Sequence, residues 1–89
     1  DEAWQRLSSG YALSLTSGMT LKPVTVMHRT RYELTGFPAK ALPRLKTLGF
    51  YSEIIAWQTR LFLPTDEAGK HALVSLLALD PIAANPQAR

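Results

Sequence analysis

Cysteine is absent from the 89 residues of this chain, so neither disulfide bonds nor thiolate–metal sites contribute to its stability or chemistry. The redox state of its compartment is therefore left open by the sequence. Long apolar runs are also lacking. No stretch approaches the roughly 18 apolar residues that a membrane-spanning helix requires, and no basic-then-apolar leader opens the chain. We therefore expect no membrane partner, with the cytoplasm as the default location.

An initiating methionine is lacking as well, because the chain begins Asp1-Glu2, and this favours a domain taken from a longer protein. The length corresponds to one domain, and a chain of this size buries only somewhat more than about 60% of its unfolded surface. We expect residues 10–82 to form a single compact domain. Residues 1–9 resemble the end of an upstream helix, and residues 83–89 are expected to be a flexible tail.

Acidic residues are scarce in the middle of the chain. Residues 22–60 contain seven Lys or Arg side chains against two Glu side chains, a net charge of +5, whereas the segment on either side carries a net −1. The middle segment is therefore where an acidic partner would be attracted.

Two long segments, residues 24–35 and 53–63, show the alternation of a β-strand, and we predict one strand for each. One face of each strand mixes arginine with apolar side chains: Thr25, Met27, Arg29, Arg31 and Glu33 in the first, and Ile54, Ala56, Gln58, Arg60 and Phe62 in the second. The opposite faces are mainly apolar and are expected to point to the core: Val24, Val26, His28, Thr30, Tyr32 and Leu34, and Ile55, Trp57, Thr59, Leu61 and Leu63.

Leucines at helical spacing predict a short helix over residues 42–48, with Pro43 in the first turn, where a missing N–H is tolerated. A second helix over residues 66–79 follows Thr65, the expected N-cap. Five of its residues are expected to face the core: Gly69, Ala72, Leu73, Leu76 and Leu77. Residues 11–16 predict a third strand, which pairs antiparallel with the next through a turn at Ser17-Gly18.

These elements predict an α+β domain, a two-layer sandwich in which a three-stranded mixed sheet (about 11–16, 24–35 and 53–63) carries both helices on one face. The helix between the two long strands predicts a right-handed crossover, which makes these strands parallel. Trp57 would then be buried in mid-strand. The substitution Trp57→Ala is expected to cost about 3–5 kcal/mol, while Arg60→Ala should be nearly neutral if Arg60 is exposed to solvent.

Signals for catalysis or metal binding are missing. His28 and His71 are the two histidines and have no partners at ligand spacing, and the serines lack a nucleophile motif. We expect one histidine in the core or at its edge and the other at the surface. The sequence thus predicts no enzyme, no cofactor and no metal.

The arginine-bearing sheet face favours a non-catalytic module that binds nucleic acid, either DNA or RNA. Three sets of residues would form the site: Arg29, Arg31 and Arg60 for charge and stacking, Met27 and Phe62 for apolar contact, and Lys22, Lys40 and Lys46 for outer steering. Two alternatives stay open. The arginines could merely solvate an open sheet and pair with Glu33 and Glu53, or the domain could contact other domains of its parent protein or another protein through an apolar patch.

Overall fold

The computed structural model describes residues 2–15 and 18–79. In chain order the elements are α1 (Glu2–Ser8), β1 (Leu13–Ser14), β2 (Thr20–Val26), β3 (Arg29–Thr35), the 3-10 helix η1 (Ala39–Ala41), α2 (Leu42–Leu48), β4 (Tyr51–Ile55), β5 (Gln58–Leu63) and α3 (Glu67–Leu79). The end of the expected first strand, residue Ser17 of its turn and the expected tail over residues 83–89 lie outside the described residues.

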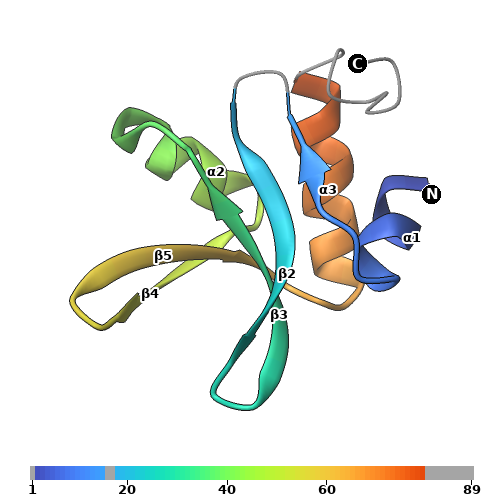
Figure 1. Ribbon diagram of the computed structural model, residues 1–89. Coiled ribbons are helices and arrows are strands. Elements are labelled where there is room, and N and C mark those ends of the chain that lie inside the picture. Colours follow the sequence, from blue (N-terminus) through green and yellow to red (C-terminus); the bar gives the residue numbers. More distant parts are fainter. Residues whose placement is uncertain (1, 16–17, 80–89) are drawn as a thin grey trace.

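The five strands form one sheet in the order β1-β2-β3-β5-β4, and every neighbouring pair is antiparallel. The α+β class is therefore confirmed, but the three-stranded mixed sheet and its parallel crossover are wrong. Each long predicted strand is in fact a β-hairpin, β2–β3 or β4–β5, and the central pair β3–β5 joins the two hairpins. Their tips extend away from the helices in different directions, toward the bottom and the left of Figure 1.

The two hairpins are formed by two-residue turns that are not indicated by turn-favouring residues in the sequence. The turn residues are Met27-His28, with φ of 52° and 67°, and Ala56-Trp57, with φ of 52° and 68°. Positive φ at both central residues is the arrangement of a type I′ turn, which matches the twist of the flanking strands. Such turns normally contain Gly, Asn or Asp, and neither of these pairs does. An alternating pattern without such a residue therefore predicts one continuous strand where the structure has a hairpin.

Each turn also changes which residues share a face of the sheet. Val26 pairs with Arg29, and Ile55 pairs with Gln58, so both members of each pair lie on the same face. In an unbroken strand these residues would point to opposite faces. The predicted faces are consequently right for β3 and β5, and reversed for the parts of β2 and β4 that the prediction covered.

The position of Trp57 is the most important of these corrections. Trp57 lies in the β4–β5 turn with 98% of its surface exposed, instead of being buried in mid-strand. The predicted cost of Trp57→Ala therefore has no basis in this fold.

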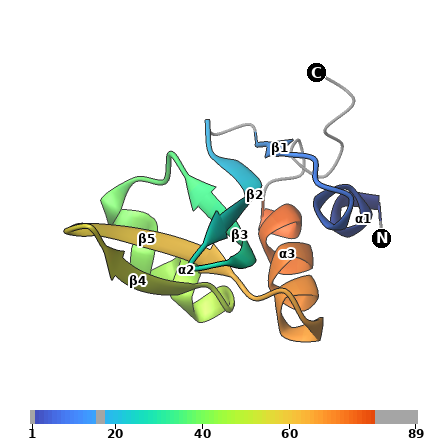
Figure 2. The ribbon, with the colours of Figure 1, turned by 60° about the horizontal axis from the view of Figure 1, so that its bottom comes forward.

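The helices α2 and α3 cover one face of the sheet, as Figure 2 shows. The buried apolar cluster lies between these layers and includes Leu21, Leu34, Leu61 and Leu63 from the strands. The helix predicted over residues 42–48 is confirmed, with Pro43 in its first turn and Gly49 at its end.

The helix α3 is confirmed within one residue of its predicted start. Its buried residues are the five expected ones: Gly69, Ala72, Leu73, Leu76 and Leu77. The expected cap at Thr65 is not observed; instead the backbone N–H of Ala68 donates to Oδ1 of Asp66, at 3.1 Å. Gly69 lies so close to β5's end that a Cβ at this position would be 1.6 Å from the carbonyl oxygen of Pro64, so a larger residue could not pack there.

The short helix α1 packs against the rest of the domain. Ala3 and Leu7 belong to the buried cluster, and the Trp4 ring meets the Tyr32 ring edge-on at 5.5 Å between centroids. None of the helices in the described ranges is long and apolar enough to cross a membrane.

Candidate nucleic-acid interface

The side of the sheet opposite α2 and α3 is called the arginine face here. The strand register places these polar and aromatic side chains at its centre: Arg31 and Glu33 from β3, Arg60 and Phe62 from β5, and Tyr51 and Glu53 from β4. It also places three exposed residues on the same face: Lys22, Arg29 and Gln58. Glu33 lies beside Phe62, and Phe62 beside Tyr51, along one row across the three strands. Arg31, Arg60 and Phe62, three residues of the predicted site, are thus brought together.

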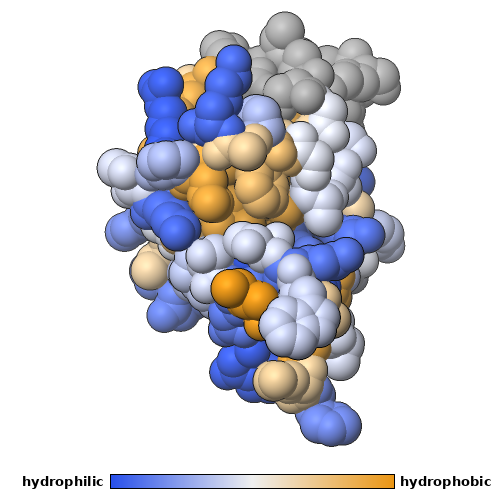
Figure 3. Space-filling model, turned by 90° about the vertical axis from the view of Figure 1, so that its left-hand side faces the viewer, coloured by the Kyte–Doolittle hydropathy of each residue, from blue (hydrophilic) through white to orange (hydrophobic). Residues whose placement is uncertain are grey.

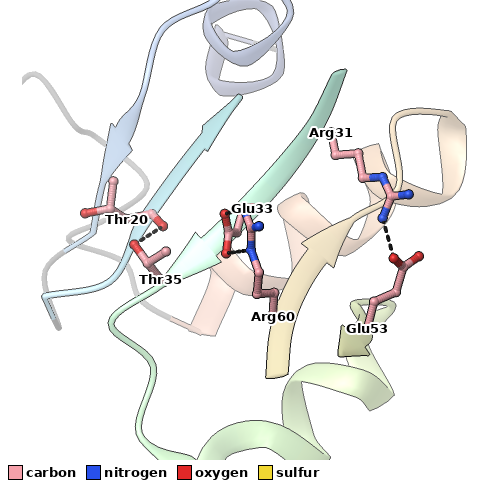
Figure 4. Close-up of polar contacts among 6 residues, drawn as sticks. All are labelled: Thr20, Arg31, Glu33, Thr35, Glu53 and Arg60. Atoms are coloured by element: carbon pink, nitrogen blue, oxygen red, sulfur yellow. Dashed lines mark hydrogen bonds and ion pairs between the residues drawn. The ribbon is translucent and has the colours of Figure 1, made fainter. Parts of the chain in front are cut away.

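Two ion pairs connect these side chains, as Figure 4 shows. The guanidinium of Arg60 donates twice to the Glu33 carboxylate, from Nε to Oε2 at 2.9 Å and from Nη2 to Oε1 at 2.6 Å. Nη1 of Arg31 lies 2.7 Å from Oε1 of Glu53. A fork of two parallel bonds is the strong form of this interaction. Each pair links one hairpin to the other.

Burial distinguishes these pairs from ordinary surface contacts. Only 5% of the surface of Arg31 and 8% of that of Glu33 is exposed. The hydrogen bond to Glu53 raises the pKa of Arg31, and the hydrogen bond to Glu33 raises the pKa of Arg60, while burial works in the opposite direction in both cases. Both guanidinium groups therefore stay protonated, and their charge is balanced by carboxylates within the fold.

The Phe62 ring lies beneath the two arginines. Its exposed surface is 0%, and the guanidinium carbons of Arg31 and Arg60 are 5.1 Å and 5.6 Å from its centroid. Tyr51 covers another side at 5.7 Å between ring centroids. These are cation–π distances, and they explain how an aromatic ring can be buried on a sheet face that no helix covers. In this arrangement Phe62 offers no ring face to a nucleotide base.

The other residues of the predicted site surround these side chains or lie outside the arginine face. Lys22, which pairs with Glu33 in the strand register, and Arg29 are exposed residues of the same face on β2 and β3, and Met27 is in the β2–β3 turn with 75% of its surface exposed. Lys40 and Lys46 are on η1 and α2, in the helical layer rather than on the arginine face. The structure therefore divides the predicted site into a buried centre and separate exposed cations.

The exposed cations of the middle segment have no carboxylate partner. The five are Lys22, Arg29, Lys40, Arg44 and Lys46. Among the described residues no carboxylate oxygen lies within ion-pair distance of any of them, because both acids of the segment are taken by Arg31 and Arg60. These five exposed side chains consequently carry the whole net charge of +5 of residues 22–60.

The three most exposed of the large apolar side chains in the described residues lie in the two hairpins. Trp57 is joined by Ile54 of β4, which is 75% exposed, and by Met27 in the other turn. Sequence reasoning missed Trp57 as a surface residue, because only a Gly, Asn or Asp in the turn would have indicated that the strand ends there.

An apolar hollow of about 310 Å³ lies on the helical side of the molecule. It is lined by Met19, Ala41, Arg44, Leu45, Leu48, Leu76 and Leu79. In Figure 3 a hydrophobic area occupies the upper part of the face and is bordered by hydrophilic side chains, while the narrower lower part mixes the two kinds. Leu79, the last described residue, is one of the lining residues of this hollow.

Both histidines are at the surface. His28 is an exposed turn residue and His71 lies on the exposed side of α3, so the expectation of one histidine in the core or at its edge is wrong. Within residues 2–15 and 18–79 no three His, Cys, Asp or Glu side chains are grouped so that they could hold a metal ion.

Comparisons with protein-family models, with curated proteins and with solved structures gave no significant match to this chain.

Proposed function

We propose that this domain is a non-catalytic module that binds nucleic acid, and that its contacts are made by the exposed cations and the hairpin tips instead of the buried, ion-paired centre of the arginine face. The observation that carries the proposal is the pairing of Glu33 and Glu53 inside the fold. This pairing leaves five exposed cations without a carboxylate partner among the described residues. An array of unpaired Lys and Arg side chains is what attracts and holds a phosphate backbone.

The ion-paired centre of the arginine face has a structural role in this proposal. Arg31 and Arg60 hold β3, β4 and β5 together around Phe62, and each guanidinium lies against a carboxylate of the fold, while Nε of Arg31 is buried without a hydrogen-bond partner. The cations for phosphate contact come from two places, Lys22 and Arg29 on the β2–β3 hairpin and Lys40, Arg44 and Lys46 on η1 and α2.

The salt dependence of binding tests the proposal. A labelled single-stranded oligonucleotide of roughly 20 nucleotides exceeds the site of one small module. Its affinity should fall as salt rises, with a slope in log affinity against log salt of about 0.7 for each neutralised phosphate. Fluorescence anisotropy at several salt concentrations measures this slope. Binding that is weak and independent of salt would remove the proposal.

Variants in which lysine or arginine is replaced by alanine locate the residues that contact phosphate. We expect Lys40→Ala/Arg44→Ala/Lys46→Ala to lower the slope by up to about 2, and Lys22→Ala/Arg29→Ala by up to about 1.4. The control is Lys70→Ala, which removes a cation from α3, outside the basic segment, and should leave the slope unchanged.

A protein-interaction domain is the second candidate, and the exposure of Ile54, Trp57 and Met27 favours it. The strand β4 is also at an edge of the sheet, where its free side could pair with a strand of another chain. Sedimentation of the isolated domain over a range of concentrations separates the two candidates. A shift with protein concentration alone supports protein contact, whereas a shift only with oligonucleotide supports the first candidate.

A further inference from the structure

The β4–β5 turn combines two unfavourable features. Ala56 and Trp57 both have positive φ, which L-residues with a Cβ disfavour, and glycine or asparagine would adopt this backbone more readily. The Trp57 ring is also almost fully exposed to water, so it contributes little packing to the fold. Backbone strain together with an exposed large aromatic is typical of a residue that contacts a ligand.

The surroundings of Trp57 indicate the chemistry of that ligand. Residues 54–59 carry no charge, and Gln58 and Thr59, which follow Trp57, are exposed side chains able to donate and accept hydrogen bonds. Elsewhere on the domain, the β2–β3 hairpin, η1 and α2 carry the five exposed cations that have no carboxylate partner among the described residues. Modules that bind single-stranded nucleic acid combine an aromatic ring that stacks on a base with cations that contact the backbone. A duplex offers no free base face in its interior.

We propose that Trp57 stacks on an unpaired base of a single-stranded nucleic acid, so that the tip of the β4–β5 hairpin makes the module prefer single strands to duplex. This inference rests on the proposed function, because the cations supply the backbone contact. The β4–β5 hairpin extends beyond the helical layer (Figure 1). Trp57 in its turn is 98% exposed, so a flexible strand can reach the indole ring.

The affinity test compares variants of the turn on one single-stranded oligonucleotide and on its duplex. Trp57→Ala should weaken single-strand binding by about 5- to 150-fold, the range expected for one stacked base, and leave duplex binding unchanged. Trp57→Phe keeps a ring and should retain most of the affinity. Tyr11→Ala is the matched control, since Tyr11 is an exposed aromatic next to α1 and should have no effect.

A turn variant separates folding from binding. Ala56→Asn/Trp57→Gly supplies the residues that a type I′ turn prefers, so it should fold at least as well as the parent protein. It should nevertheless bind single strands as weakly as Trp57→Ala does. Retained binding in this variant would overturn the stacking role.

Fluorescence gives a readout that does not depend on affinity. The chain has two tryptophans, and Trp4→Phe leaves Trp57 as the only one. Single-stranded oligonucleotide should then quench the emission. Inorganic polyphosphate, which has charge but no bases, should compete for binding without quenching.

The failures are distinguishable. If no oligonucleotide binds in a salt-dependent way, the proposed function itself is wrong. If oligonucleotide binds but Trp57→Ala changes neither affinity nor strand preference and no quenching occurs, only the stacking inference is wrong. If the protein self-associates and Trp57→Ala abolishes this, the tip docks on protein, which also overturns the inference.

Discussion

The least and the most buried aromatic side chains of the described residues are only five positions apart. Trp57 is in the β4–β5 turn with almost its whole surface in water, and Phe62 on β5 is completely buried between Arg31 and Arg60. Hydrophobicity alone would rank both as core residues. Their exposure differs because only Phe62 has side chains packed over its ring.

Substitution of these two aromatics by alanine should therefore give opposite results. Trp57→Ala is expected to change the free energy of unfolding by less than about 0.5 kcal/mol, since it removes almost no buried surface. Phe62→Ala is expected to cost about 3–5 kcal/mol, because it leaves a cavity beneath two arginines. Urea denaturation of both variants measures the difference. A large loss with Trp57→Ala would mean that the ring packs against the domain in solution.

The ion pairs of the arginine face were only partly foreseeable at the level of single residues. The sequence allowed Glu33 and Glu53 to pair with the arginines, and the structure contains these pairs. Their burial was not predictable, because it depends on how tightly β3, β4 and β5 bring the side chains around Phe62. Alternation states which face a residue is on, but not how much water reaches it.

At the scale of elements, the two turns are the feature that most affects the fold. Met27-His28 and Ala56-Trp57 have nearly the same backbone angles and the same absence of Gly, Asn and Asp. The strand pairing on both sides of each turn keeps these residues in a backbone conformation that residues with a Cβ disfavour. The long β2–β3 ladder of seven paired positions makes this clear, since it continues to the turn without interruption.

Substitutions in the β2–β3 turn can measure the free-energy cost of the positive φ angles at Met27 and His28. Met27→Asn/His28→Gly supplies residues that adopt positive φ readily, and we expect it to raise the free energy of unfolding by about 1 kcal/mol. The control Met27→Ala/His28→Ala removes the same side chains but keeps the unfavourable backbone, so its stability should not rise. Thermal or chemical denaturation checks both. A loss of stability in the Asn-Gly variant would show that Met27 or His28 makes contacts that stabilise the hairpin.

At the scale of the whole molecule, the sequence predicted the helices and their buried faces much better than the sheet. Leu73, Leu76 and Leu77 repeat at a helical spacing over many residues, so the core-facing side of α3 could be identified. The strand arrangement depended on two dipeptides without a turn signal. Once these were missed, two hairpins became two strands, and a helix between two strands implied a parallel crossover. The cations at the surface were predictable from composition, whereas the exposed position of Trp57 was not.

The ion pairs of the arginine face have a consequence for the rates of folding and unfolding. Arg60 and Glu33 are 27 residues apart, and in both pairs one side chain comes from each hairpin. A hairpin can form from neighbouring residues alone, but these pairs can form only after β3 has met β5. They should therefore be largely absent from the transition state for folding.

Glu33→Gln, which keeps the shape of the side chain but removes its charge, is expected to accelerate unfolding and leave the folding rate almost unchanged. Stopped-flow measurements over a range of denaturant give both rates, with the more exposed Glu53→Gln as a milder comparison. Slower folding in Glu33→Gln would mean that the hairpins dock early. With the expected result, the ion pairs of the arginine face determine how slowly the domain unfolds. The apolar layer between the sheet and the helices then determines how quickly it folds.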